Sequence, residues 1–263
     1  MKHFVEARRQ DAEKYGPLAD LRLVQCYFRM KDATQLKTAL ATLEKSSPDG
    51  YRILPAGVLR WCGWMCFRDK DYTAADKLLT DTLSREPKET YKAPDGSDRE
   101  RPKVEPLVWK SLAHARLELG KYAEGVEAAQ HYVSMEQQPY RKAEGMSDEA
   151  QLLLGLNRAT EARKLCEDAI AMGVDGPMKS ALFITLGDTY YAESQFAEAS
   201  KYYGRTANVA SDADLKPNAL YRLACALRRC GRTSEAEPYE TTLTTEFPNW
   251  KPDKKVEDFM NRP

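Results

Sequence analysis

The chain of 263 residues is 42% hydrophobic and 30% charged, and its 40 Lys and Arg balance its 40 Asp and Glu. This neutrality argues against a general nucleic-acid-binding protein, which shows a basic excess or stripe, so we expect no nucleic-acid partner. No run approaches the roughly 18 apolar residues of a membrane-spanning helix, and we expect no membrane insertion.

The first residues, MKHFVEARRQDAEKYG, contain no apolar core of the signal-peptide type. The sequence as written therefore predicts a cytoplasmic location. A cell-envelope location stays open for a chain from which a leader has been trimmed.

The residue types that carry most catalytic and metal chemistry are sparse and scattered. The three histidines and six cysteines form no His-x-x-x-His or Cys-x-x-Cys pair, so we expect no zinc site and no disulfide framework. Cys62 and Cys66 are four residues apart but fall at apolar packing positions, where free Cys acts as a small hydrophobe. No glycine-rich phosphate loop occurs. We therefore expect no metal, no cofactor, no catalytic residue and no enzymatic activity.

Taken in chain order, the sequence predicts pairs of helices. Residues 1–16 are expected to cap the N-terminal end or to be the remnant of an earlier repeat. The first pair begins near residue 17 and the second near residue 56. Their second halves, KDATQLKTALATLEKSSP and KDYTAADKLLTDTLSREP, align without gaps. Residues 88–105, KETYKAPDGSDRERPKVE, are rich in charge and turn formers, and we expect an exposed loop inserted there.

Four further pairs begin near residues 106, 143, 180 and 217 and keep a 37-residue step. A small residue in each first helix is followed twelve positions later by another, as with Gly187 and Ala199. Apolar residues recur at three- and four-residue spacing, which is typical of amphipathic helices. Gly120 and Gly231 suit the ends of first helices, where a left-handed residue is often needed. Residues 251–263 are expected to form a polar capping helix or tail.

The small residues predict where helices cross. A side chain larger than a methyl group at Gly187 or Ala199 would hold the two helices of a hairpin apart. The neighbouring aromatic side chains then fill the wider gaps around the crossing, as native packing density requires.

These residues resemble the tetratricopeptide repeat, a unit of about 34 residues with Trp-x-x-Leu-Gly-x-x-Tyr in its first helix and Ala-x-x-x-Phe in its second. The best match is the fifth unit, and the resemblance covers residues 17 to 250. The matching residues there are Phe183, Leu186, Gly187, Tyr190, Ala199 and Tyr203.

The resemblance implies an all-α fold: a right-handed α-solenoid of helix-turn-helix repeats, one continuous domain with a C-terminal capping helix. Stacking is what buries the apolar faces of such units. The chain departs from the family in its 37-residue step and at Leu36. In the fourth unit, Gly145 and Gly155 are expected to weaken the first helix.

The resemblance also implies a concave groove lined by first-helix residues, and a non-catalytic scaffold that binds a peptide or a partner protein there. Since Trp and Arg are enriched among residues that carry binding energy, we expect a partner with acidic and apolar side chains. The candidate binding residues are Phe28, Arg29, Arg60, Trp64, Phe67, Arg68, Lys110, His114, Asp188, Tyr191, Tyr221 and Arg228.

Three alternatives stay open at this point. Trp61 and Trp64 could pack against neighbouring helices beneath a solvated arginine face. The chain could be a structural or self-assembling subunit that uses its convex face or its ends. It could be a helical-repeat RNA-binding protein, against which the neutral charge argues. A chaperone-type carboxylate clamp is disfavoured, because no Asn follows Arg60 or Lys110 by four positions.

Overall fold

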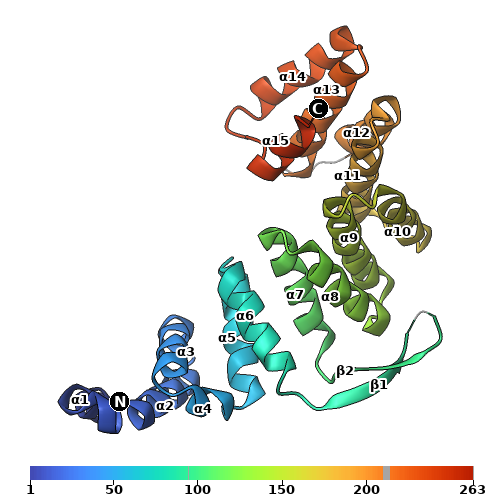
Figure 1. The fold of residues 1–263 in the computed structure, drawn as a ribbon. Coiled ribbons are helices and arrows are strands. Elements are labelled where there is room, and N and C mark those ends of the chain that lie inside the picture. The colour runs from blue at the N-terminus through green and yellow to red at the C-terminus, as the bar shows by residue number, and fades with distance from the viewer. Residues whose placement is uncertain (94, 210–213, 263) are drawn as a thin grey trace. The chain divides into compact units, whose positions relative to one another are not determined.

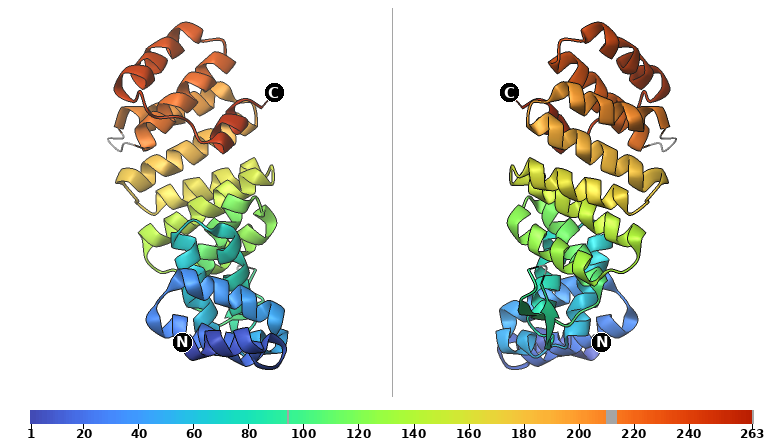
Figure 2. Two further views of the ribbon diagram at one scale, coloured as in Figure 1. Left: turned by 90° about the vertical axis from the view of Figure 1, so that its left-hand side faces the viewer. Right: turned by 90° about the vertical axis from the view of Figure 1, so that its right-hand side faces the viewer.

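The computed structural model describes residues 1–93, 95–209 and 214–262. Where the sequence analysis expects one continuous domain, the chain divides into two compact units, Met1–Leu119 and Gly120–Pro263. The described residues form fifteen helices and one two-stranded sheet, so the fold is all-α, an α-solenoid of helical hairpins (Figures 1 and 2). None of these helices combines the length and the apolar character that crossing a membrane requires.

The first unit contains seven helices and the β-hairpin. Its elements are α1 (Lys2–Gln10), α2 (Ala12–Met30), α3 (Ala33–Ser46), α4 (Pro48–Arg52), α5 (Ala56–Arg68), α6 (Tyr72–Leu83), β1 (Lys88–Lys92), β2 (Asp98–Pro102) and α7 (Pro106–Leu119). Consecutive helices pack as hairpins, α2 with α3 and α5 with α6.

The second unit continues the same pattern. Its elements are α8 (Tyr122–Met135), α9 (Pro139–Gly155), α10 (Ala159–Ala171), α11 (Gly176–Ala192), α12 (Phe196–Val209), α13 (Leu215–Arg229), α14 (Thr233–Glu246) and α15 (Lys254–Met260). Here α9 packs on α8 and α10, α11 on α12, and α13 on α12 and α14.

The first predicted unit begins earlier in the structure than near residue 17. Asp11 caps α2 by accepting a hydrogen bond from the Lys14 backbone N–H at 2.9 Å, so the helix starts at Ala12. Pro17 lies inside α2. Residues 1–16 therefore supply a separate helix, α1, and the first turn of α2.

A left-handed residue follows each of the helices α2, α5, α7, α9, α11 and α13. Its φ lies between 58° and 79° in all six, and the last four are 37 residues apart; the residues are Lys31, Lys70, Gly120, Asn157, Ser194 and Gly231. A left-handed residue lets the backbone N–H groups after the helix bond back to its last carbonyls. Two of these six positions carry the glycine that the sequence analysis used as its signal.

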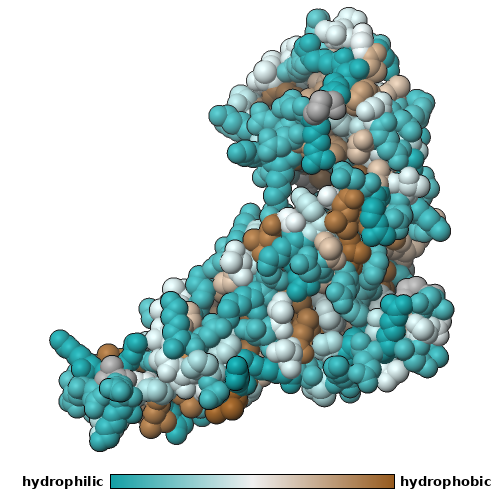
Figure 3. Space-filling model, in the orientation of Figure 1, coloured by the Kyte–Doolittle hydropathy of each residue, from teal (hydrophilic) through white to brown (hydrophobic). Residues whose placement is uncertain are grey.

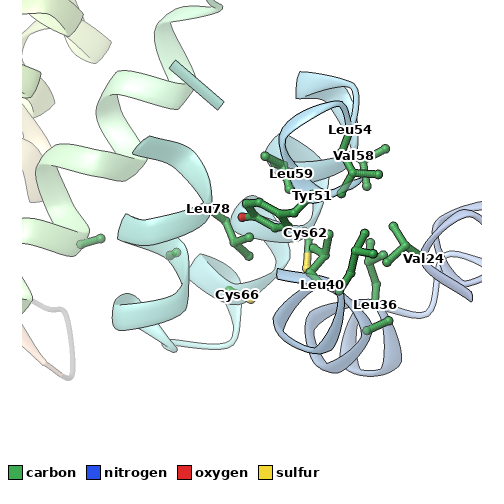
Figure 4. Close-up of a cluster of buried hydrophobic side chains, with 14 residues drawn as sticks. Val24, Leu36, Leu40, Tyr51, Leu54, Val58, Leu59, Cys62, Cys66 and Leu78 are labelled. Carbon is green, nitrogen blue, oxygen red and sulfur yellow. The ribbon is translucent and has the colours of Figure 1, made fainter. Parts of the chain in front are cut away.

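The core of the first unit is built by α2 to α6. Val24, Leu36 and Leu40 meet Leu59 and Cys62 in one buried cluster (Figure 4). Leu36, which stands at a normally small position of the repeat, is fully buried there. The first hairpin therefore accommodates this departure inside its core.

Small first-helix residues make room for the second helix, as expected. A Cβ placed on Gly187 would lie 2.3 Å from the Tyr203 ring, and one on Gly63 would lie 2.9 Å from Leu79. The glycines at 145 and 155 do not interrupt α9, which runs unbroken over 17 residues. A Cβ on Gly145 would lie 2.4 Å from the Tyr132 ring, so this glycine accommodates an aromatic side chain of the neighbouring helix α8.

The inserted segment contains an antiparallel hairpin where the sequence analysis expects a loop (Figure 1). Opposite charges face each other across the two strands: Arg101 Nε donates to Glu89 Oε1 at 2.9 Å, and Lys92 Nζ lies 2.9 Å from Asp98 Oδ1. Opposite-charge cross-strand pairs stabilise a two-stranded ribbon. The charged residues that led us to expect a loop instead form cross-strand ion pairs in the hairpin.

Candidate protein-docking site

A pocket of about 410 Å³ opens on the first unit. It lies where the first helices α2 and α5 meet the start of α7. Its principal lining residues are Phe28, Arg60, Trp61, Trp64, Leu107 and Val108. We call this the α5 pocket. The visible surface of the molecule is mostly hydrophilic, with separate apolar patches (Figure 3).

The helical repeat of α5 places the pocket residues on one side. Arg60 and Trp64 are four residues apart, and Trp61 lies between them in sequence, so all three fall within one turn. The opposite side of α5 carries Cys62 and Cys66, which are buried in the core. The core residues thus fix which face of α5 reaches solvent.

The inner wall of the α5 pocket is aromatic. The rings of Phe28 and Trp61 meet edge to face, with centroids 5.9 Å apart and an interplanar angle of 78°. The Lys31 ammonium lies 4.4 Å from the Phe28 ring centroid and 5.0 Å from that of Trp61. Cations at such distances are attracted to aromatic faces, so the left-handed turn residue Lys31 adds a positive charge beside the pocket.

Two large apolar residues of the pocket face solvent. Trp64 is 42% exposed and Leu107 is 58% exposed. The Arg68 guanidinium lies 5.3 Å from the Trp64 ring. Neither side chain is covered by the core, so both offer apolar contact area to another molecule.

The basic group that lines the pocket is the Arg60 guanidinium. Its Nη1 lies 3.7 Å from Glu86 Oε1 and 3.6 Å from Glu105 Oε1, and its side chain is 35% exposed. Both distances exceed those of strong charge-assisted hydrogen bonds. Arg60 therefore lies near the carboxylates of Glu86 and Glu105 but forms no close two-pronged pair with either of them.

Two further predicted residues of this unit lie in an aromatic cluster beside the pocket. The Phe67 ring centroid is 5.7 Å from that of His114, at an interplanar angle of 85°, and the Tyr72 ring is 6.0 Å from His114. This cluster joins α5, α6 and α7. Arg29 is exposed at the end of α2 and Lys110 is half-buried in α7.

The predicted residues of the second unit are engaged in contacts within that unit. Asp188 is 8% exposed, and Tyr191, at 4% exposed, donates its hydroxyl to the Met260 carbonyl at 2.6 Å. Arg228 forms a two-pronged pair with Glu240, both distances being 2.6 Å. Asp188 and Tyr191 are therefore buried rather than presented to solvent as the sequence analysis expects.

The candidate binding residues predicted from the sequence do not include Trp61, Leu107, Val108 or Lys31. Trp61 was considered only as a packing residue, and Lys31 belongs to a turn. Two signals in the sequence could have identified Trp61. It lies near Trp64 in the chain, and it falls on the face of α5 opposite the packing residues Cys62 and Cys66. No signal in a single sequence places Lys31 over two aromatic rings.

Within the described ranges, no group of three or more His, Cys, Asp or Glu side chains is arranged to hold a metal ion. Cys62 and Cys66 are buried. A hydrogen bond between the two thiols raises the pKa of Cys62 and lowers that of Cys66. Their burial matches the packing role expected from the sequence.

Residues 111–177 match the family model described as tetratricopeptide repeat. The same hairpins continue on both sides of the matched residues, and solved repeat structures superimpose along the chain. Residues 111–177 therefore carry tetratricopeptide-repeat sequence, and the chain shares the helical-hairpin fold of such repeats.

Several solved structures share the fold of this repeat protein at low sequence identity. PilF of Pseudomonas aeruginosa is 13% identical with a TM-score of 0.53, over 95% of this chain and 98% of PilF. BtubC of P. vanneervenii is 14% identical with a TM-score of 0.56, over 88% of this chain and 94% of its own. The quorum sensor NprR of B. thuringiensis, in its apo form, is 16% identical with a TM-score of 0.56, over 96% of this chain and 75% of NprR. No curated protein matches the sequence significantly.

Proposed function

We propose that this repeat protein is a non-catalytic interaction scaffold, and that its α5 pocket binds a partner segment carrying an apolar side chain beside an acidic one. The observation that carries the proposal is the exposure of Trp64 and Leu107 around a pocket of about 410 Å³. A volume in this range is typical of binding pockets. The repeat fold supports a role in protein–protein interaction in general.

The wall of the α5 pocket favours an apolar side chain in the partner. Phe28 and Trp61 form an ordered aromatic surface, and Trp64 and Leu107 stand at its edge. Burying such apolar surface stabilises a complex by about 25 cal/mol per Å² before the cost of association is counted. An inserted leucine or aromatic side chain fits this wall.

The charges around the α5 pocket favour an acidic side chain in the partner. Lys31, Arg60 and Arg68 lie beside its aromatic side chains, while Glu105 is the acidic residue of the lining. A partner carboxylate can accept from Arg60 or Arg68, because guanidinium groups bind carboxylates in a planar, two-pronged geometry. The pocket thus favours acidic over basic flanking residues.

The test is selection of binding peptides from a display library of short random sequences, with the unmodified chain, Trp64→Ala and Ile53→Ala as parallel targets. Ile53 is an exposed apolar residue, 74% accessible, that does not line the pocket, so Ile53→Ala is the matched control. We expect selected peptides to combine Leu or aromatic residues with Asp or Glu. Trp64→Ala should weaken their binding at least about tenfold, because truncating an interface tryptophan costs on the order of 2 kcal/mol.

Circular dichroism establishes that the variants keep their helicity. Peptides that bind Trp64→Ala as tightly as the unmodified chain would exclude the α5 pocket as the site. Selected peptides with basic rather than acidic flanks would exclude the proposed partner chemistry. Affinity for the acidic peptides should also fall as salt is raised, since part of it comes from exposed charges.

A further inference from the structure

The C-terminal helix α15 does not extend the row of hairpins. It folds back beside the last hairpins of the second unit, against the first helices α11 and α13 (Figures 1 and 2). Two of the binding residues predicted from the sequence, Tyr191 and Tyr221, lie on these helices. The structure shows that both are already in contact with the chain's own C-terminal segment.

The apolar side of α15 packs on a surface around Tyr191 of α11 and Arg229 of α13, which we call the seat. The Phe259 ring centroid lies 5.7 Å from that of Tyr191, and Met260 is 2% exposed. Val256 also packs against this cluster. Positions 256, 259 and 260 are three and four residues apart, which puts their side chains on one face of a short helix. The Trp250 ring, ahead of α15, lies 5.9 Å from Tyr221.

The polar contacts lie at the carboxyl end of α15, one at its last residue Met260 and one at Arg262 just beyond the helix. The Tyr191 hydroxyl donates to the Met260 carbonyl at 2.6 Å, and the Arg229 guanidinium donates to the Arg262 carbonyl. The last carbonyls of a helix have no partner within it, and cations are favoured at that end. Arg229 is itself held by the Phe196 ring, 4.6 Å away. The seat therefore selects both an apolar face and a helix direction.

The helix that occupies this seat has little stability of its own. It has seven residues, and isolated helices shorter than about 12 residues are marginal in water. Lys254, Lys255 and Glu257 are exposed on its other side. Elements with few buried contacts open more readily than the core they rest on.

We propose that the face of α11 and α13 is a second docking site, that it binds short amphipathic helices through apolar residues at positions i, i+3 and i+4 and through their C-terminal carbonyls, and that α15 is its resident occupant. A partner helix of the same chemistry binds there by displacing α15. This site is separate from the α5 pocket and does not depend on it.

If α15 must be displaced, the apparent affinity for an added helix depends on how firmly α15 is bound. A tethered occupant competes at a high effective concentration, in the millimolar range for short flexible linkers. The apparent dissociation constant of an added helix is its intrinsic value divided by the fraction of chains with an open seat. Weakening α15 should therefore strengthen the binding of an added helix without any change in the seat.

The experiment uses the full-length chain and a labelled peptide of residues 250–262 with the native sequence as the probe. The variant carries Phe259→Asp and Met260→Asp, which release α15 by placing charge in its apolar seat. Fluorescence anisotropy should show that the peptide binds the released variant at least about tenfold more tightly than the unmodified chain, as expected when a competitor is removed. Equal binding to both, or no binding to a released variant of native helicity, overturns the proposal.

Two controls test the site itself. In the released variant, Tyr191→Phe and Arg229→Gln should weaken peptide binding because each removes a donor to a carbonyl at or just beyond the end of the helix, whereas Arg228→Gln should not. A peptide carrying Phe259→Ala and Met260→Ala should bind neither form tightly. Unchanged peptide binding after Tyr191→Phe with Arg229→Gln would place the peptide elsewhere on the chain.

Hydrogen exchange measures the opening of α15 directly in the unmodified chain. The amides of α15 should exchange through local opening, at least about tenfold faster than those of α11 and α13, since the docked helix belongs to the less stable elements. If the amides of α15 exchange only through global unfolding, α15 is an integral part of the fold and is not displaced. A concentration-dependent dimer that protects α15 would show that a second copy, rather than the same chain, supplies the occupant.

Discussion

The carboxylate of Asp188 in α11 and the guanidinium of Arg222 in α13 form a buried ion pair between the first helices of two consecutive hairpins. Arg222 Nε lies 2.9 Å from Asp188 Oδ1, and the two side chains are 8% and 12% exposed. Tyr203 of α12 donates its hydroxyl to the same carboxylate oxygen at 2.7 Å. Burial raises the pKa of Tyr203 well above its usual value, so the hydroxyl remains a donor.

Removing one member of this pair should destabilise the second unit strongly. Asp188→Asn leaves a buried guanidinium without its counter-charge, which costs about 3–5 kcal/mol. Urea unfolding followed by circular dichroism measures the loss. The double variant Asp188→Leu with Arg222→Leu should recover much of it, because both buried charges are gone.

The matched control for this pair is Arg228→Ala. Arg228 pairs with Glu240 in the same unit, but both side chains are more than a third exposed. Exposed pairs contribute about 0–1 kcal/mol. A loss as large as that of Asp188→Asn would show that burial does not set the difference between the two pairs.

Gly187→Ala should lower stability by about 1–3 kcal/mol, the usual cost of overpacking a core. The added methyl would lie 2.3 Å from the Tyr203 ring, so the helices α11 and α12 would have to separate. Thermal and urea unfolding of the variant measure the effect.

Gly204→Ala is the control for Gly187→Ala. Gly204 lies in α12, and its nearest neighbour to an added Cβ is Leu223 at 4.0 Å. Alanine is the better helix former there by about 1 kcal/mol, so this variant should be neutral or stabilised. Equal destabilisation by both substitutions would contradict a steric cause at Gly187.

Gly231→Ala should destabilise the last hairpin by about 1 kcal/mol through its backbone alone. Gly231 has φ +79°, and no atom lies within 4 Å of an added Cβ. A left-handed conformation costs an L-residue about 1–2 kcal/mol. The comparison is Gly16→Ala in α2, which is equally uncrowded but helical. If both substitutions change the urea midpoint alike, the turn conformation is not the cause.

The buried Glu149 of α9 should make the second unit less stable as pH rises. Burial raises the pKa of its carboxyl above 4.5, although Gln130 Nε2 donates to its Oε1 at 3.0 Å. A folded-state pKa above the unfolded value contributes stability that is present at low pH and lost as pH rises through the folded pKa. Because the shift is upward, that loss begins above about pH 4.5.

Glu149→Gln removes this titration and keeps an amide of similar shape. Its free energy of unfolding should therefore exceed that of the unmodified chain by a margin that widens from about pH 4.5 towards neutrality. Urea titrations at a series of pH values measure the margin. A margin that is constant or narrows with increasing pH would mean that the Glu149 carboxyl is ionised without penalty in the folded chain.

Much of the helical architecture could be predicted because its causes are local. The 37-residue step, the apolar spacing and the small residues at Gly63 and Gly187 are all visible in the sequence. The structure bears out the helical hairpins and the fold. The β-hairpin of residues 88–102 was missed, because pairing of its charges depends on which residues lie opposite each other, and neither strand has an apolar face to show it.

The candidate site was only partly predictable. Arg60 and Trp64 were identified because the resemblance to the tetratricopeptide repeat implies a groove lined by first-helix residues. Trp61 and Leu107 were not, since an apolar residue in a helix has the same pattern whether a neighbour covers it or leaves it open. Tyr191 was predicted at the surface, and the helix that covers it lies far away in the sequence.

The sequence by itself determined the repeat, the helical class and the positions where helices approach closely, because these follow from periodicity and residue size within a short window. Tertiary structure alone decided which surfaces remain open. The α5 pocket stays open at Trp64, while the seat on α11 is filled by Met260, 69 residues beyond Tyr191. Exposure depends on which distant segments pack together, and this cannot be predicted from the local sequence pattern.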